Sequence, residues 1–181
     1  MTVKETKLKG CFILKPKVFE DSRGYFFESF NQNTFNKLIG ESVNFIQDNE
    51  SYSSKGVLRG LHYQAGEYAQ AKLVRVVKGS VLDVAVDIRE DSPTYGQHIS
   101  IELSEENKKQ IYIPRGFAHG FIVLSDTAIF SYKCDNFYNK ESERGIIYND
   151  KDLNIDWVLN KKEFIVSEKD LQLPILKESI L

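Results

Sequence analysis

Residues 72–89, KLVRVVKGSVLDVAVDIR, decide the fold class of this chain. From residue 80 onward apolar and polar side chains alternate, with Leu82, Val84, Val86 and Ile88 at even positions and Asp83, Asp87 and Arg89 at odd positions. This period of two predicts a strand with one core face and one polar face. Residues 72–77 form a second apolar run, and 78–80 (KGS) suit a turn, so we expect a hairpin.

Further runs of this kind follow along the chain. Strands are predicted at 97–103, 110–113, 117–124 and 128–134, turns at 91–96, 114–116 and 125–127, and extended segments at 24–30 and 44–48. Helix signals are few. One short helix is expected at 31–39, with Asn31 or Asn33 as its N-cap and Gly40 beyond its end, and another turn could begin at Ser167.

These patterns predict a mostly β protein of jelly-roll type, with a few short peripheral helices. The sequence contains no internal repeat, no low-complexity tract and no Gly/Ser linker. We therefore expect one domain over residues 1–181, with its core at roughly 10–175.

Composition excludes several functional classes. The 24 Lys and Arg residues against 26 Asp and Glu give a net charge of −2, which argues against a nucleic-acid partner. The longest apolar stretches are short, such as 121–124, so no membrane span or membrane partner is expected. Residues 1–10 are polar and show no signal peptide. Cys11 and Cys134 are isolated, which favours free thiols in a cytoplasmic protein.

Common cofactor motifs are absent from the sequence. No two glycines stand two residues apart, so the dinucleotide-binding G-x-G-x-x-G is missing. The three histidines, His62, His98 and His119, cannot form the H-x-H pair that metal-binding jelly rolls often use. We therefore predict no metal site.

The segment GVLRGLHYQ, residues 56–64, places Arg59 and His62 in an apolar, glycine-containing strand. Such residues are costly inside a fold unless they are paired or functional. An edge strand with both side chains in solvent explains them about equally well. They are three positions apart, so both can reach one pocket only if a bulge re-phases the strand, and Gly60 suits that bulge.

Other candidates have simpler explanations. His119 lies between aromatic residues in IPRGFAHGF, and Tyr132 lies in FSYKC, so each could be a core residue with its polar atom satisfied. Arg23 follows a turn and could be a plain surface residue. Ser167 and Asp170 fit an S-x-x-D capping box at the start of a short helix.

Taken together, these side chains match one kind of chemistry. A His base, a Tyr acid and a Lys cation suffice for proton transfer at a carbon next to a ketone. The resulting enolate needs a cation or hydrogen-bond donor, which Lys72 or a histidine could supply. Arginines suit the phosphates of a nucleotide-linked substrate.

The sequence also closely resembles the dTDP-4-dehydrorhamnose 3,5-epimerase family. The resemblance rests on DSRGYFFES (21–29), VLRGLHYQ (57–64), AKLVRVVKGSVLDVAVDIREDSPTYG (71–96), IPRGFAHGFIVLS (113–125) and the element ending in ERGI (141–146). These motifs occur in order and at the spacing of the family. A joint match of this extent is much more specific than any one motif.

The resemblance implies a cupin-like double-stranded β-helix that forms a homodimer and uses no metal or organic cofactor. It implies epimerisation at C3 and C5 of dTDP-4-dehydro-6-deoxy-D-glucose, giving dTDP-4-dehydro-L-rhamnose in dTDP-L-rhamnose biosynthesis. The substrate partner is thus a dTDP-linked 4-keto-6-deoxy sugar.

Residue roles follow from the resemblance by position. The base falls on His62, the acid on Tyr132, and the carboxylate that orients the base on Asp170, with Asp83 as the alternative. Substrate contacts fall on Arg23, Glu28, Gln47, Asn49, Arg59, Lys72, His119, Glu143 and Lys169. Arg23 and Arg59 would bind the diphosphate, and Lys72 and His119 the sugar. An exchanged N-terminal strand would carry Arg23 and Glu28 across the dimer.

The chain departs from the family pattern at 137–141 (FYNKE instead of Y-Y-x-P-E), at Asp150-Lys151 and at Trp157-Val158. Two other functions stay open on sequence alone. A mono-epimerase would share the same acid and base but act at C3 or C5 only, on a related nucleotide sugar. A non-catalytic jelly roll would bind the nucleotide sugar without exchanging its protons.

Overall fold

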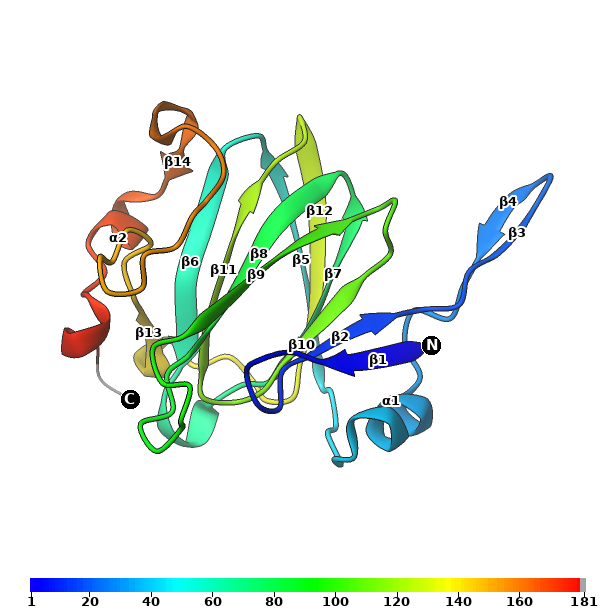
Figure 1. Cartoon of the computed structure of the whole chain (residues 1–181), viewed down its shortest axis with the longest axis horizontal. Coiled ribbons are helices and arrows are strands. Elements are labelled where there is room, and N and C mark those ends of the chain that lie inside the picture. The colour runs from blue at the N-terminus through cyan, green and yellow to red at the C-terminus, as the bar shows by residue number, and fades with distance from the viewer. Residues whose placement is uncertain (180–181) are drawn as a thin grey trace.

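Two β-sheets packed face to face form the body of the computed structural model, which describes residues 1–179 (Figure 1). The first sheet has the strand order β1 (Thr2–Glu5), β2 (Phe12–Lys15), β10 (Gln110–Ile113), β7 (Lys72–Lys78), β12 (Thr127–Cys134) and β5 (Gln47–Ser54). The second has the order β13 (Glu143–Gly145), β6 (Val57–Gln64), β11 (Phe117–Val123), β8 (Ser80–Asp87) and β9 (His98–Ser104), with the short β14 (Ile165–Val166) beside β6. The fold is mostly β and is a cupin-like jelly roll, as predicted.

The expected hairpin between residues 72–77 and 80–89 is wrong, although both strands exist. β7 pairs with β10 and β12 in the first sheet, whereas β8 pairs with β11 and β9 in the second. The turn at Gly79, with φ of 74°, carries the chain from one sheet to the other. A short turn between two strands therefore marks a corner of the jelly roll here, and not a pair of neighbouring strands.

Apolar and polar residues alternate in β8 as predicted, but the polar face of the strand is not exposed to solvent. The even residues Leu82, Val84 and Val86 pack on the outer side of the second sheet, beneath the C-terminal segment. The odd face looks between the two sheets, where Asp83 is fully buried. The apolar part of that interior is made of Leu8, Cys11, Val74, Val76, Val81, Ala85, Leu103, Ile111, Ile113, Phe117, Phe121, Val123, Ala128 and Phe130.

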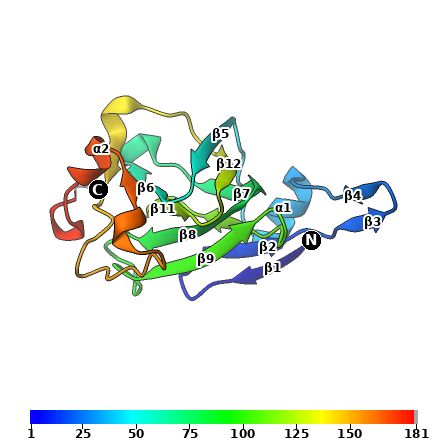
Figure 2. The same cartoon turned by 90° about the horizontal axis from the view of Figure 1, so that it is seen from above.

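Helices are short and lie at the periphery (Figures 1 and 2). α1 (Gln32–Ile39) begins after Asn31, whose side chain accepts a hydrogen bond from the Thr34 amide at 3.0 Å. It ends at Gly40, which has the left-handed φ of 75° that favours glycine at this position. α2 (Glu168–Leu171) follows Ser167. Single 3₁₀ turns occur at Gly66–Tyr68, Lys140–Ser142, Lys161–Glu163 and Leu176–Glu178. The caps Asn31 and Gly40 are confirmed.

An arm made of β3 (Phe19–Asp21) and β4 (Gly24–Phe26) projects from the body (Figures 1 and 2). Its aromatic residues Phe19, Tyr25 and Phe26 are 53%, 58% and 70% exposed. The expected extended segment at 24–30 is therefore a strand only at its beginning.

The C-terminal segment covers the outer face of the second sheet. Leu153, Trp157 and Leu176 are buried against that sheet, and the Trp157 indole donates to the Tyr148 carbonyl at 2.9 Å. This packing places β14 and α2 beside β6. No helix in the described part of the chain is long and apolar enough to cross a membrane.

The bulge expected at Gly60 is present in β6. His62 pairs with His119 and Arg59 with Phe121, so two residues of β6, Gly60 and Leu61, stand opposite one residue of β11, Gly120. Gly60 has a φ of 115°, a backbone conformation that residues with a Cβ rarely adopt. A Cβ at this position would also lie 2.7 Å from both the Gly120 Cα and the His119 carbonyl oxygen.

We predict that Gly60→Ala destabilises the protein by at least about 2 kcal/mol, because backbone strain and steric overlap add. Urea unfolding measures the change. Gly40→Ala is the matched control, since Gly40 also has positive φ but a Cβ there would meet nothing within 4 Å. We expect Gly40→Ala to lower the free energy of unfolding by only about 1 kcal/mol. Equal losses for the two variants would contradict a packing constraint at Gly60.

Candidate active site

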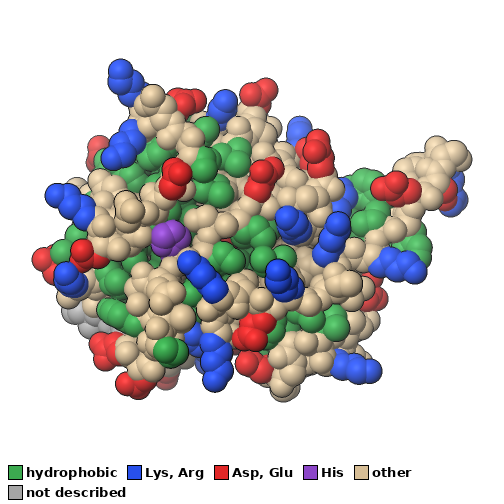
Figure 3. Space-filling view, in the orientation of Figure 1, with side chains coloured by type: hydrophobic (Ala, Val, Ile, Leu, Met, Phe, Trp, Pro, Cys, Tyr) green, Lys and Arg blue, Asp and Glu red, His purple; other side chains and the backbone are tan. Residues whose placement is uncertain are grey.

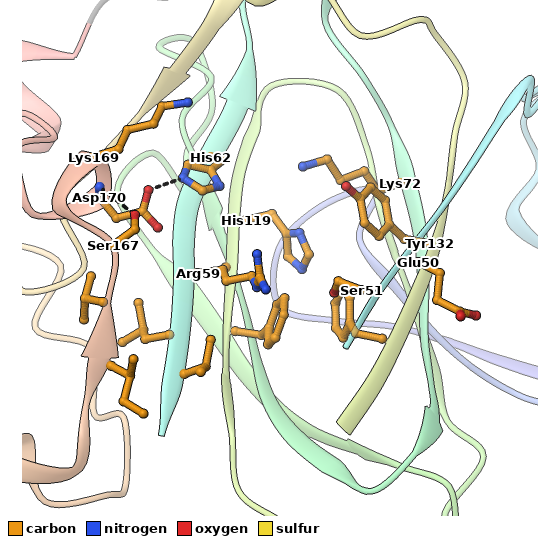
Figure 4. A pocket seen from close by; sticks show the side chains of 17 residues that line it. Glu50, Ser51, Arg59, His62, Lys72, His119, Tyr132, Ser167, Lys169 and Asp170 are labelled. Carbon is orange, nitrogen blue, oxygen red and sulfur yellow. Dashed lines mark hydrogen bonds and ion pairs between the residues drawn. The ribbon is translucent and has the colours of Figure 1, made fainter. Parts of the chain in front are cut away.

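A cavity of about 520 Å³ opens between the two sheets. Its polar wall comes from β5, β6, β7, β11 and β12 and from the segment that leads into α2 (Figure 4). The face in Figure 3 shows an exposed histidine with Lys and Arg side chains near it. Seven of the predicted site residues line the cavity: Arg59, His62, Lys72, His119, Tyr132, Lys169 and Asp170.

His62 and Asp170 form the closest ionisable pair of the cavity. The His62 Nε2 lies 2.7 Å from Asp170 Oδ1, and the Gly60 amide donates to Asp170 Oδ2 at 3.2 Å. A carboxylate accepts hydrogen bonds, so Nε2 carries the proton and Nδ1 is the basic nitrogen. That second nitrogen points away from Asp170, toward the cavity (Figure 4).

The environment of Asp170 keeps it ionised. Burial opposes the charged form, but the hydrogen bonds from His62, Gly60 and Ser167 outweigh burial and lower the pKa of Asp170. Ser167 caps α2 by accepting from the Asp170 amide at 3.1 Å. Only this half of the expected S-x-x-D capping box is seen, because the Asp170 side chain turns to His62 instead.

Asp83 occupies a different position from Asp170. It lies beneath His119, with Oδ2 2.9 Å from the His119 Nε2, so the cavity contains two separate His–Asp pairs. His119 is 7% exposed and stacks on Phe130, and burial lowers the pKa of its imidazole. Asp83 Oδ1 has no hydrogen-bond partner among the described residues. The structure therefore brings Asp170, and not Asp83, to His62.

Tyr132 and Lys72 lie across the cavity from His62 (Figure 4). Tyr132 comes from β12 in the first sheet, whereas His62 comes from β6 in the second. Burial raises the pKa of the Tyr132 hydroxyl and lowers the pKa of the Lys72 amine, whose Nζ is 5.9 Å from the Tyr132 ring centre. The arrangement places a neutral acid and a cation opposite a base.

Two cations of the cavity have no charged partner. Within residues 1–179, neither Arg59 nor Lys72 forms an ion pair. Lys169 differs, because its Nζ donates to Glu143 at 2.7 Å. The cavity thus presents two cations without ion-pair partners, which favour an anionic ligand.

The rim beside Lys169 is an organised segment. Tyr138 donates from its hydroxyl to Glu143 at 2.9 Å, and hydrogen bonds from Lys169 and Tyr138 lower the pKa of Glu143 against the opposing effect of burial. Three glutamines hold the backbone of this rim. Gln47 accepts from the Tyr138 amide, Gln64 accepts from the Asn139 amide, and Gln70 donates to the Asn136 carbonyl.

The remaining predicted residues divide into two groups. Gln47 and Asn49 lie on β5, near the cavity wall formed by Glu50 and Ser51. Arg23 and Glu28 do not reach the cavity of their own chain. Arg23 pairs with Asp21 on the arm at 2.5 Å, and Glu28 accepts from Asn31 at 3.2 Å.

Sequence reasoning missed most of β5, predicting only an extended segment at 44–48. Gln47, Asn49, Ser51 and Ser53 alternate with more exposed residues, but all are polar, so the strand lacks an apolar face. Polar side chains at every second position were the available signal, because a strand that lines a polar cavity needs no apolar face. Within residues 1–179, no three His, Cys, Asp or Glu side chains are placed to hold a metal ion.

Comparison with known proteins identifies the family. A family model described as dTDP-4-dehydrorhamnose 3,5-epimerase matches residues 5–178. The chain belongs to this family. It is therefore an isomerase of the dTDP-4-dehydrorhamnose 3,5-epimerase type.

Individual relatives of this epimerase family agree over nearly the whole chain. The Shigella flexneri dTDP-4-dehydrorhamnose 3,5-epimerase is 56% identical over 171 residues, covering 94% of this chain and 93% of the relative. A crystal structure of the Elizabethkingia anophelis enzyme superposes with a TM-score of 0.95 at 58% identity, covering 98% and 97% of the two chains. The Legionella pneumophila epimerase, solved with dTDP-4-keto-L-rhamnose, gives a TM-score of 0.94 at 48% identity, covering 98% and 93%.

Proposed function

We propose that this protein epimerises C3 and C5 of dTDP-4-dehydro-6-deoxy-D-glucose to give dTDP-4-dehydro-L-rhamnose, in dTDP-L-rhamnose biosynthesis. The observation that carries the proposal is the His62–Asp170 pair, which faces Tyr132 across a cavity with two unpaired cations. The ligand in the Legionella relative supports the substrate class.

The reaction is a pair of proton transfers next to the C4 ketone. His62 Nδ1 removes the proton from C3, and the C–H electrons move into the C3–C4 bond to form an enolate. Tyr132 then delivers a proton to the opposite face of C3, which inverts that carbon. Because C3 and C5 both flank C4, the same base and acid serve C5 after the two groups have exchanged protons with water.

Lys72 lies where it can stabilise the developing oxyanion, and His119 binds the sugar. The half-buried Lys72 supplies a cation partly removed from bulk water, where its effect on a nearby charge is larger than in water. Asp170 keeps His62 in the tautomer that leaves Nδ1 basic, and Asp83 holds the ring of His119. Arg59 binds the diphosphate.

Each active site also needs a second copy of this chain. Within residues 1–179, β5 has no strand on its outer edge, while the projecting arm carries Arg23 away from its own cavity. In a homodimer, each arm would lie along the free edge of the partner's β5. The edge strand and the arm would then both be in contact with a second chain. This arrangement brings Arg23 and Glu28 beside Gln47 and Asn49, where Arg23 adds to the diphosphate site.

We also infer a cytoplasmic location. Cys11 and Cys134 are free and buried, and burial raises the pKa of their thiols to about 12 and about 11. Such unpaired thiols suit a reducing compartment.

Isotope exchange at C3 and C5 of the substrate tests the proposed function. In D₂O, purified protein should replace the protons at both C3 and C5 of dTDP-4-dehydro-6-deoxy-D-glucose with deuterium, as followed by NMR. His62→Ala should lower the rate by about 10²- to 10⁴-fold, because it removes the base. Full turnover by His62→Ala would exclude the mechanism.

The pattern of exchange separates the competing functions. Exchange at one carbon alone would identify a mono-epimerase. Binding of the nucleotide sugar without exchange at either carbon would identify a non-catalytic binding protein.

Activity at alkaline pH tests the role of the Lys72 cation. Burial lowers the pKa of Lys72 and raises that of Tyr132, so Lys72 loses its proton at lower pH, and Tyr132 at higher pH, than the same groups in water. We expect kcat/KM to fall as Lys72 loses its proton. Lys72→Arg should move the fall to higher pH, since a guanidinium stays charged. If kcat/KM of Lys72→Arg falls at the same pH as that of the wild type, the fall belongs to another titrating group.

Mixing two variants of low activity, Arg23→Ala and His62→Ala, tests whether the active site is shared between two copies of the chain. If Arg23 acts in the partner's cavity, each mixed dimer contains one intact site, and random reassembly should recover about a quarter of the wild-type activity. Size-exclusion chromatography should show a dimer for each variant and for the mixture. If Arg23 acts in its own cavity, or has no role in substrate binding, the mixture will show no gain over the activities of the separate variants.

A further inference from the structure

Arg59 is held by an uncharged partner. Its Nε and Nη2 both donate to the Ser53 hydroxyl oxygen, at 3.3 and 3.1 Å. Ser53 is 5% exposed and comes from β5 in the first sheet, whereas Arg59 comes from β6 in the second. This contact therefore joins the two sheets at the cavity.

Three other arginines of the chain show a different pattern. Arg23, Arg89 and Arg115 each pair with an aspartate, at 2.5, 2.7 and 2.8 Å. A carboxylate next to Arg59 would compete with a phosphate for the guanidinium. A hydroxyl fixes the direction of the group and leaves its charge available to an anion.

The geometry also selects which edge of the guanidinium is free. Ser53 occupies the edge formed by Nε and Nη2. The edge formed by the two terminal nitrogens keeps its hydrogens for a ligand. That edge matches two phosphate oxygens in a bidentate contact.

We propose that Ser53 is a positioning residue that orients Arg59 toward the diphosphate of the substrate. The inference rests on the proposed function, in which Arg59 binds that diphosphate. Ser53 itself does not line the cavity, so it acts on the substrate only through Arg59. Its loss therefore affects binding of the nucleotide part and leaves the proton transfers at His62 and Tyr132 unchanged.

Ser53→Ala tests the proposal. We expect the Kd for dTDP, measured by calorimetry, and the KM for the nucleotide sugar to rise about tenfold, the loss of one oriented charged contact. The value of kcat should stay within about twofold of wild type. Ser53→Thr keeps the hydroxyl and should restore both constants. An unchanged Kd in Ser53→Ala, or a fall in kcat without a change in KM, would overturn the proposal.

Ser104→Ala is the matched control for loss of a buried serine. Ser104, the last residue of β9, is 6% exposed, and its hydroxyl accepts from the Asn107 backbone amide at 3.0 Å. Its variant therefore reports the effect on stability without touching the cavity. Urea unfolding of the variants checks that each is folded. A rise in the Kd for dTDP in Ser104→Ala equal to that in Ser53→Ala would also overturn the proposal.

A double-mutant cycle with Arg59→Ala separates the inference from the function on which it rests. If Ser53 acts through Arg59, Ser53→Ala should have no further effect on dTDP affinity once Arg59 is absent. An equal effect in both backgrounds would overturn the proposal. If Arg59→Ala weakens dTDP binding but Ser53→Ala does not, only the role of Ser53 fails. If Arg59→Ala leaves dTDP binding unchanged, the assignment of Arg59 to the diphosphate fails as well.

Discussion

The bulge at Gly60 is the constraint on which the rest of the active site depends. Without the extra residue in β6, Arg59 and His62 would point to opposite faces of the second sheet. With it, one strand supplies both a cation and a base to the same cavity. The amide of Gly60 also donates to Asp170, so the irregular backbone and the carboxylate that orients His62 stabilise each other.

The charges in the cavity depend on which ionisable side chains form ion pairs. His62 and His119 are each bonded to an aspartate, which orients their rings, while Arg59 and Lys72 form no ion pair within residues 1–179. Burial then acts in opposite directions on the two groups facing His62, favouring neutral Tyr132 and weakening the hold of Lys72 on its proton. The groups proposed as acid, base and oxyanion-stabilising cation thus lie around one cavity.

The arm and the edge strand β5 are related features of one chain. The arm exposes three aromatic rings and carries Arg23 away from the body, and β5 has one unpaired edge among the described residues. Exposed edges and exposed aromatic patches are both sites where chains associate. The shared active site that we propose accounts for the distance between His62 and the predicted substrate contacts Arg23 and Glu28 within one chain.

Much of the fold was predictable from local pattern. Alternation and apolar runs identified β7 to β12, whereas the short strands β1, β2, β3, β13 and β14 were not predicted. Asn31 and Gly40 marked the ends of α1, because strand faces and helix caps depend on residues close in the chain. The need for a bulge at Gly60 followed from the spacing of Arg59 and His62. Family motifs named the site residues, but assigned the orienting carboxylate only as Asp170 or Asp83.

Tertiary structure decided what each strand and each face meets. The period of β8 showed which residues share a face, but not that Asp83 faces the interior or that β7 and β8 belong to different sheets. β5 was mostly missed, since its inward side chains line a polar cavity. Asp170 reaches His62 across 108 positions of sequence. Such pairings depend on how distant segments pack, which the order of residues along one strand does not contain.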